Sequence, residues 1–144
     1  AVGVNSRLDE LQAAILRVLL PHLDEWADGR RAAARMYEAA GLGEFVGLSP
    51  VPAGAEPAWH LYVVRHPHAD ALLAALHDAG IETRAYYRTP LHRQPAMAPY
   101  VRSGLELPGT DELARTNVAL PMSPVLDQAQ VREVAAAVAT FAVS

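Results

Sequence analysis

The stretch SRLDELQAAIL, residues 6–16, opens a long amphipathic segment from which the rest of the fold can be worked out. Ser6, followed three positions later by the acidic Asp9, matches a capping box and predicts a helix start. Apolar residues then recur at helical spacing, namely Leu8, Leu11, Ile15, Val18 and Leu19. The sequence therefore begins with an amphipathic helix.

The helical pattern continues past Pro21. A proline removes a backbone donor and clashes with the preceding turn, so it predicts a bend at this point. Steps of three and four residues nevertheless persist as far as Tyr37. We predict one long, bent helix from about Leu8 to Ala40, ended by Gly41 as its C-cap. Because such a helix is long for a small domain, we expect it to pack against more than this chain supplies.

The remaining sequence alternates short strand and helix patterns, without an internal repeat or an interdomain linker. Strand patterns occupy residues 45–49, 59–65 and 81–87 with a short extended piece at 118–121, and helical patterns occupy 69–79, 111–117 and 127–142. Residues 88–109 are rich in proline and weakly periodic, which is typical of a functional loop. We predict a single α+β domain over residues 1–144. Residues 1–40 form its interface helix, and residues 41–144 place helices on one face of a mainly antiparallel, three- to four-stranded sheet.

Composition excludes several classes of protein. With 12 basic and 16 acidic residues, the formal charge of -4 argues against nucleic acid as a partner. The absence of cysteine excludes disulfides and thiolate metal sites. No apolar run approaches the roughly 20 residues needed to span a bilayer. The N-terminus lacks the regions of a signal peptide, so we expect a cytoplasmic chain, or one entered in mid-sequence.

All 12 basic residues are arginine, and the chain contains no lysine. Schiff-base chemistry on a carbonyl, or on pyridoxal phosphate, requires a lysine amine. Any such reaction must take its lysine from elsewhere.

Several blocks of sequence resemble the DegT/DnrJ/EryC1/StrS family of sugar aminotransferases. GVNSRLDELQAAIL at residues 3–16 matches the family's G-x-N-x-R-L-D-E-L-Q-A-A block almost position for position. The family's later blocks follow in the same order, as WHLYVV at 59–64, GIET at 80–83, PLH at 90–92 and QP at 94–95. Residues 117–124, with the helix that follows them, resemble the family's last segment.

The resemblance implies the small C-terminal domain of an aspartate-aminotransferase-like fold, following a large domain that binds pyridoxal phosphate. The Schiff-base lysine and the groups around the pyridine ring are then expected upstream, so we expect no catalytic residue in this chain and predict it to be inactive alone. In the family, the Asn of G-x-N-x-R reaches the cofactor phosphate of the other subunit of a homodimer. This assigns Asn5 to the cofactor, with Arg7 as a phosphate ligand or an interface ion-pair residue. From the residues alone, Asn5 and Ser6 would simply cap the helix.

The resemblance also places Tyr87, His92 and Gln94 at the entrance where a nucleotide-linked sugar or cyclitol binds. Tyrosine and histidine suit such a site because each offers an apolar face with a polar tip. An ordered surface loop, packed on the terminal helix, is an equally good interpretation of the residues themselves. We expect no metal site, because the histidines have no carboxylate cluster at ligand spacing nearby.

The sequence therefore predicts the C-terminal part of an aminotransferase that uses glutamate or glutamine to aminate a keto sugar or keto cyclitol. The alternative is a non-catalytic domain for small-ligand binding or dimerisation.

Overall fold

The computed structural model describes residues 8–142 of the chain. Its elements follow in the order α1 (Glu10–Leu19), η1 (Leu20–His22), α2 (Leu23–Ala39), η2 (Leu42–Glu44), β1 (Tyr62–Arg65), α3 (Ala69–Asp78), η3 (Leu91–Arg93), η4 (Pro95–Tyr100), α4 (Pro108–Thr116), β2 (Asn117–Leu120) and α5 (Gln128–Ala142). The fold is α+β, as predicted. None of the helices in the described part of the chain is long and apolar enough to cross a membrane.

The long N-terminal helix is confirmed, with its bend at Pro21. There the chain tightens into the 3-10 turn η1 between α1 and α2, and Gly41 ends the helix with a left-handed φ of 76°. The predicted start is wrong by about one turn. Asp9 has extended backbone angles and forms the capping box with Gln12, whose backbone N–H donates to Asp9 Oδ1 at 2.8 Å. Ser6, the predicted cap, lies outside the described residues.

The sheet has two antiparallel strands, β1 and β2, rather than three or four. Tyr62 pairs with Leu120 at one end and Arg65 with Asn117 at the other. The two other predicted strands lie along its edges, each held by a single bridge, from Gly47 to Arg65 and from Arg84 to Ala119. The pairing of residues 81–87 with β2 does not continue past Arg84. The backbone N–H of Tyr86 donates to the Asn117 side chain instead of to a backbone carbonyl.

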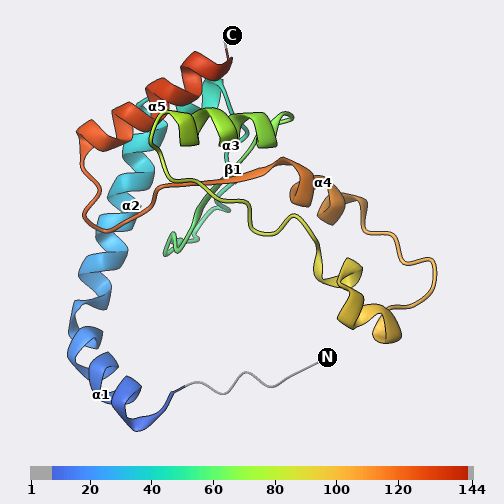
Figure 1. The fold of residues 1–144 in the computed structure, drawn as a ribbon. Helices are drawn as coiled ribbons and strands as arrows, with labels where there is room; N and C mark the ends of the chain where they lie inside the picture. The colour runs from blue at the N-terminus through green and yellow to red at the C-terminus, as the bar shows by residue number, and fades with distance from the viewer. Residues whose placement is uncertain (1–7, 143–144) are drawn as a thin grey trace.

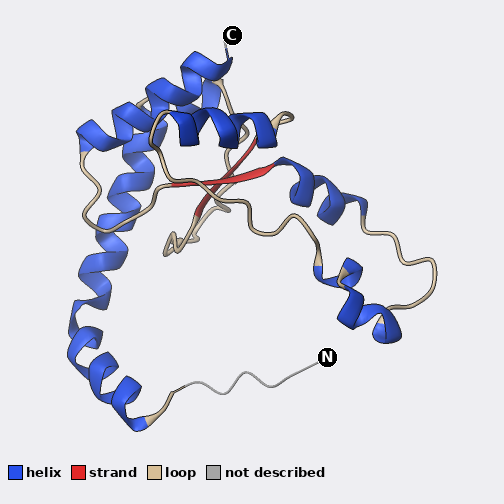
Figure 2. Ribbon diagram, viewed as in Figure 1, coloured by secondary structure: helices blue, strands red, loops and turns tan. Residues whose placement is uncertain are grey.

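The helices α2, α3 and α5 pack over one face of this sheet, as Figures 1 and 2 show. Alternation along the strands sends Val64 and Val118 into the helix-covered core and leaves Val63 on the opposite face. Within the core, the Tyr37 and Tyr62 rings stack with centroids 4.9 Å apart. The Tyr37 hydroxyl donates to the Pro121 carbonyl at 2.9 Å. Burial raises the pKa of Tyr62 to about 12, so the Tyr62 hydroxyl stays neutral at ordinary pH.

Two projections extend from this body on either side of an open space (Figure 1). One is α1 with the first part of α2. The other, which we call the arm, comprises residues 88–107 and contains η3 and η4, where the sequence predicted a functional loop. Because the helices cover the other face, the uncovered face of the sheet and both projections are the surfaces left for a site.

Candidate functional site

A groove of about 430 Å³ lies on the uncovered face of the sheet, at the root of the arm. We call it the tyrosine groove. It is lined by Ser49, Val63, Tyr86, Tyr87, Thr89, Pro90, Leu91, Thr110, Leu113, Ala114 and Asn117. These residues offer two phenol rings, several hydroxyls and apolar surface. None of them carries a charge, so the groove fits an uncharged ring better than a phosphate.

Asn117, at the start of β2, holds one wall of the tyrosine groove. Its side chain is almost completely buried, and each of its polar atoms has a partner. Asn117 Oδ1 accepts from the Tyr86 backbone N–H at 2.7 Å. Its Nδ2 donates to the carbonyls of Leu113 at 2.7 Å and Ala114 at 3.2 Å, at the end of α4. One buried amide therefore ties the Tyr86 backbone to the junction of α4 and β2.

Arg88 holds the same segment from the other side. Its Nη1 donates to the carbonyls of Ala114 and Arg115, at 2.8 and 3.1 Å, at the last turn of α4. Its Nη2 lies 2.7 Å from Asp70 Oδ1 in the first turn of α3. The guanidinium therefore supplies donors to helix-end carbonyls that lack partners within the helix.

The arm is fastened to α4 through Asp111. Arg93 donates to both carboxylate oxygens of Asp111, through Nε at 2.7 Å and Nη2 at 2.5 Å. These hydrogen bonds are the main cause that lowers the pKa of Asp111 below its ordinary value. His92 Nε2 lies 3.7 Å from the same carboxylate, and the His92 side chain is only 11% exposed.

The structure separates the three predicted substrate residues. Tyr87 lines the tyrosine groove and is 73% exposed. The His92 ring lies beside Asp111 instead, and Gln94 Nε2 donates to the Thr89 carbonyl at 3.0 Å, which closes the turn around η3. Asn5 and Arg7, predicted to contact the cofactor, lie outside the described residues.

Sequence reasoning missed Asn117, Arg88 and Asp111 as groups that shape the site. Each acts on a residue 18 or more positions away along the chain. Such contacts leave no local periodicity to detect. For Asn117, the available signal was a polar residue next to the short apolar run at 118–120.

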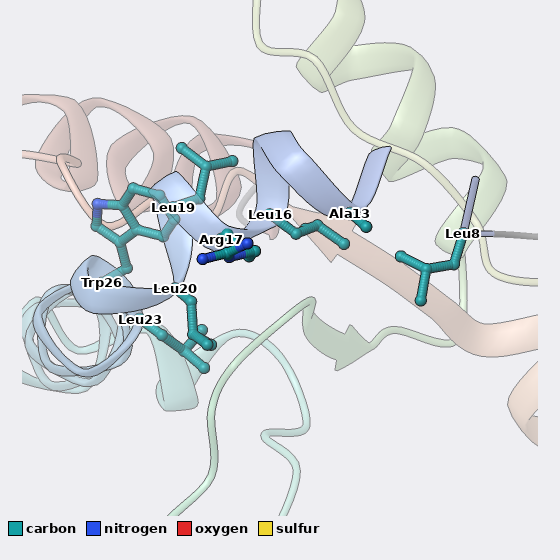
Figure 3. Close-up of a pocket in the computed structure, with 8 residues that line it drawn as sticks. All are labelled: Leu8, Ala13, Leu16, Arg17, Leu19, Leu20, Leu23 and Trp26. Atoms are coloured by element: carbon teal, nitrogen blue, oxygen red, sulfur yellow. The ribbon is translucent and has the colours of Figure 1, made fainter. Parts of the chain in front are cut away.

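A second groove, also of about 430 Å³, lies on the N-terminal projection. Figure 3 shows its lining, which comes from the segment before α1, from α1 and η1, and from the start of α2: Leu8, Ala13, Leu16, Arg17, Leu19, Leu20, Leu23 and Trp26. The helix α1 contributes no buried residue, and Leu11 is 72% exposed. This apolar helix face has no partner within the described part of the chain.

Neither groove holds the groups that pyridoxal phosphate or a metal would need. The chain has no lysine to form a Schiff base. Within residues 8–142, no three histidine or acidic side chains come together as a metal site would require. Among the described residues, the two grooves offer mainly apolar surface, with hydroxyls added in the tyrosine groove.

The chain is similar in sequence to curated sugar aminotransferases. The chain is 41% identical over 142 residues to the dTDP-3-amino-3,4,6-trideoxy-alpha-D-glucose transaminase of Streptomyces venezuelae, covering 97% of this chain and 37% of that protein. It is 38% identical over 134 residues to the UDP-N-acetyl-3-dehydro-alpha-D-glucosamine 3-aminotransferase of Acidithiobacillus ferrooxidans, covering 93% and 36%. The chain thus spans little more than a third of the length of these relatives.

Solved structures show the same relation. A DegT DnrJ EryC1 StrS aminotransferase from Brucella abortus superposes with a TM-score of 0.87 at 34% identity, covering 99% of this chain and 38% of that one. The structure of DesV from S. venezuelae with a ketimine intermediate gives 0.87 at 38% identity and the same coverage. A family model matches residues 1–139, and the chain belongs to the DegT/DnrJ/EryC1/StrS aminotransferase family.

Proposed function

We propose that this chain is the C-terminal small domain of a pyridoxal-phosphate-dependent sugar aminotransferase. The observation that carries the proposal is that the chain matches only part of a transaminase and lacks the lysine that such an enzyme needs. The chain aligns over 97% of itself with a transaminase, yet it covers 37% of that relative and contains no lysine. When bound, the cofactor carries the amino group between donor and acceptor. The lysine and the cofactor pocket then belong to the remaining part of the parent protein.

The proposed reaction moves an amino group from glutamate or glutamine to the ketone of a nucleotide-linked keto sugar or of a keto cyclitol. Two relatives are named as enzymes of dTDP- and UDP-linked sugars, which supports a nucleotide-linked acceptor. The tyrosine groove, with Tyr87 on its wall, is the binding surface that this chain contributes. His92 and Gln94 are proposed to complete the entrance, because both lie in the arm that leads away from this groove.

The N-terminal projection is proposed to join this domain to the rest of a homodimer. Burying its exposed apolar face against a partner surface would stabilise the assembly by roughly 25 cal/mol per Å² of apolar area. In this arrangement residues 1–40 form the interface segment, which contains α1 and α2, and residues 41–144 form the α+β layer. Asn5 and Arg7, which precede α1 in the sequence, are proposed to reach the cofactor phosphate of the neighbouring subunit.

The test is an absorbance titration with pyridoxal phosphate, run in parallel on this chain and on the full product of its gene. We expect the full product to gain a Schiff-base band that borohydride reduces to a stable adduct, and the isolated chain to gain none. Mass spectrometry of the reduced protein then locates the modified lysine outside residues 1–144. If the full gene product forms no adduct, the enzyme proposal is wrong, and a non-catalytic binding or dimerisation domain becomes the better account.

A further inference from the structure

Alternate residues of the segment 84–88 are anchored to the rest of the domain. Arg84 exchanges two backbone hydrogen bonds with Ala119, at 3.2 and 2.7 Å. Tyr86 donates its backbone N–H to Asn117, and the Arg88 side chain bonds to the end of α4. Tyr87 lies between the last two anchors and is 73% exposed. Packing therefore contributes little to holding the Tyr87 ring, and the anchored backbone on either side sets its position.

Arg88 makes the more extensive of these two anchors. Its guanidinium joins the last turn of α4 to Asp70 in the first turn of α3. The rigid fork of arginine can meet two carbonyls and a carboxylate together, whereas a lysine ammonium is a single point charge. The Asp70 side chain is 85% exposed, so solvent screens this ion pair and the pair itself adds little stability. The contribution of Arg88 is therefore mainly geometric, because it fixes where the chain leaves Tyr87.

The lining of the tyrosine groove restricts what it can bind. The Tyr86 and Tyr87 rings lie edge to face, with their centroids 5.5 Å apart. Threonine and serine hydroxyls and apolar surface surround them. A diphosphate placed here would lose water without gaining a cation, which is costly. An uncharged ring would gain stacking and apolar contact, and the hydroxyls would bond to its polar edge.

From these contacts we infer that Arg88 is a positioning residue for substrate recognition. It fixes Tyr87 as one wall of the tyrosine groove, and the groove takes an uncharged ring of the nucleotide-linked sugar while the diphosphate stays outside. This inference rests on the proposed function. The shared chemistry of the ligand is a neutral, ring-shaped group, which either the sugar or the nucleobase can supply.

The test is a double-mutant cycle in the full gene product, read by calorimetric titration with dTDP-glucose. Tyr87→Ala and Arg88→Ala should each weaken binding by about tenfold, the loss expected when one stacking contact is removed. Because Arg88 acts through Tyr87, the double variant should bind about as well as Tyr87→Ala alone. Additive losses would show that Arg88 has only a general structural role and would overturn the inference. Arg84→Ala is the matched control, since Arg84 lies in the same segment and its side chain pairs with the exposed Glu82.

Three fragments identify the part of the ligand in the groove: thymidine, methyl α-D-glucopyranoside and pyrophosphate. We expect Tyr87→Ala to weaken binding of one of the two uncharged fragments, which names the ring, and to leave pyrophosphate binding unchanged. Equal weakening of pyrophosphate would overturn the inference. These titrations need neither turnover nor an amino donor. If the gene product forms the Schiff-base band but binds both uncharged fragments equally well with and without Tyr87, only this inference is wrong. If it forms no Schiff-base band, the proposed function is wrong.

Discussion

At Gly29 the helix α2 packs closely against the chain that follows β2. A Cβ added at Gly29 would lie 2.3 Å from the Pro124 carbonyl oxygen, which belongs to the backbone and cannot simply rotate away. Helix propensity alone would favour alanine at this position, by up to about 1 kcal/mol. The steric conflict is larger, because overpacking of this kind costs roughly 1–3 kcal/mol. Glycine at this position is therefore required by packing, against the local preference of the helix.

We predict that Gly29→Ala destabilises the chain by about 1–3 kcal/mol in urea unfolding followed by circular dichroism. Gly109→Ala in α4 is the matched control, since a Cβ there would meet no atom within 4 Å. The control should be neutral or more stable by up to about 1 kcal/mol, from helix propensity and reduced freedom of the unfolded chain. Equal stability of the two variants would contradict the close packing of α2 against Pro124.

At the scale of the element, the arm depends on one carboxylate. The arm carries η3 and η4, whose 3-10 turns bury no residue. Its attachment to α4 includes the two hydrogen bonds from Arg93 to Asp111. Because the pKa of Asp111 is lowered in the folded chain, its stabilising effect is complete above the ordinary aspartate value and is lost as pH falls through the lowered value. The arm should therefore loosen in acid before the core does.

We predict that amide hydrogen exchange in residues 91–100, corrected for intrinsic rates, accelerates as the pH falls below about 4, where aspartate begins to take up protons. Exchange in α5 should change less over the same range, because its inner face is buried in the core. Asp111→Asn should loosen the arm already at neutral pH and flatten this pH dependence. A variant whose arm still showed the original acid transition would show that a different group controls it.

At the scale of the whole molecule, one face of the first helix, α1, has no partner among residues 8–142. Leu11, Ile15 and Val18 are between 52% and 72% exposed, and α1 buries no side chain. The core instead lies between α2, α3, α5 and the sheet. Exposed apolar surface on this scale marks an interaction site. In the isolated chain, a second copy is the surface available to cover it.

We predict that the isolated chain self-associates, with an average mass in light scattering that rises with concentration. Ile15→Glu should shift this average toward the monomer, because it places a charge on the apolar face without disturbing the core. Val125→Glu is the control, since Val125 is 81% exposed and lies outside α1. A strictly monomeric wild-type chain, with no binding of hydrophobic dyes, would contradict the interface assigned to the N-terminal projection.

Local rules predicted the helices well because helix formation depends on neighbours three and four residues apart. The bend at Pro21 and the left-handed glycine at 41 were readable on the same basis. The helix start was misplaced because Ser6-Asp9 and Asp9-Gln12 both fit a capping pattern, and the chain uses the second. The sequence predicted strands at 45–49 and 81–87, where the structure has only single bridges. An apolar, extended segment does not reveal how many backbone hydrogen bonds it will form with a neighbouring strand.

The sequence by itself determined the α+β fold, the long bent helix, the family resemblance and the absence of a Schiff-base lysine, since each depends on residue identity or on short-range periodicity. Only the tertiary structure decided which side chains shape the tyrosine groove and which fasten the arm beside it. Asn117, Arg88 and Asp111 bond to groups 31, 26 and 18 residues away. The pairings of Asn117 and Arg88 exist because packing α3 and α4 around the sheet brings partly buried polar groups together, and a buried polar group must find a partner wherever the fold places it. The pairing of Asp111 with Arg93 lies at the surface, where the arm meets α4.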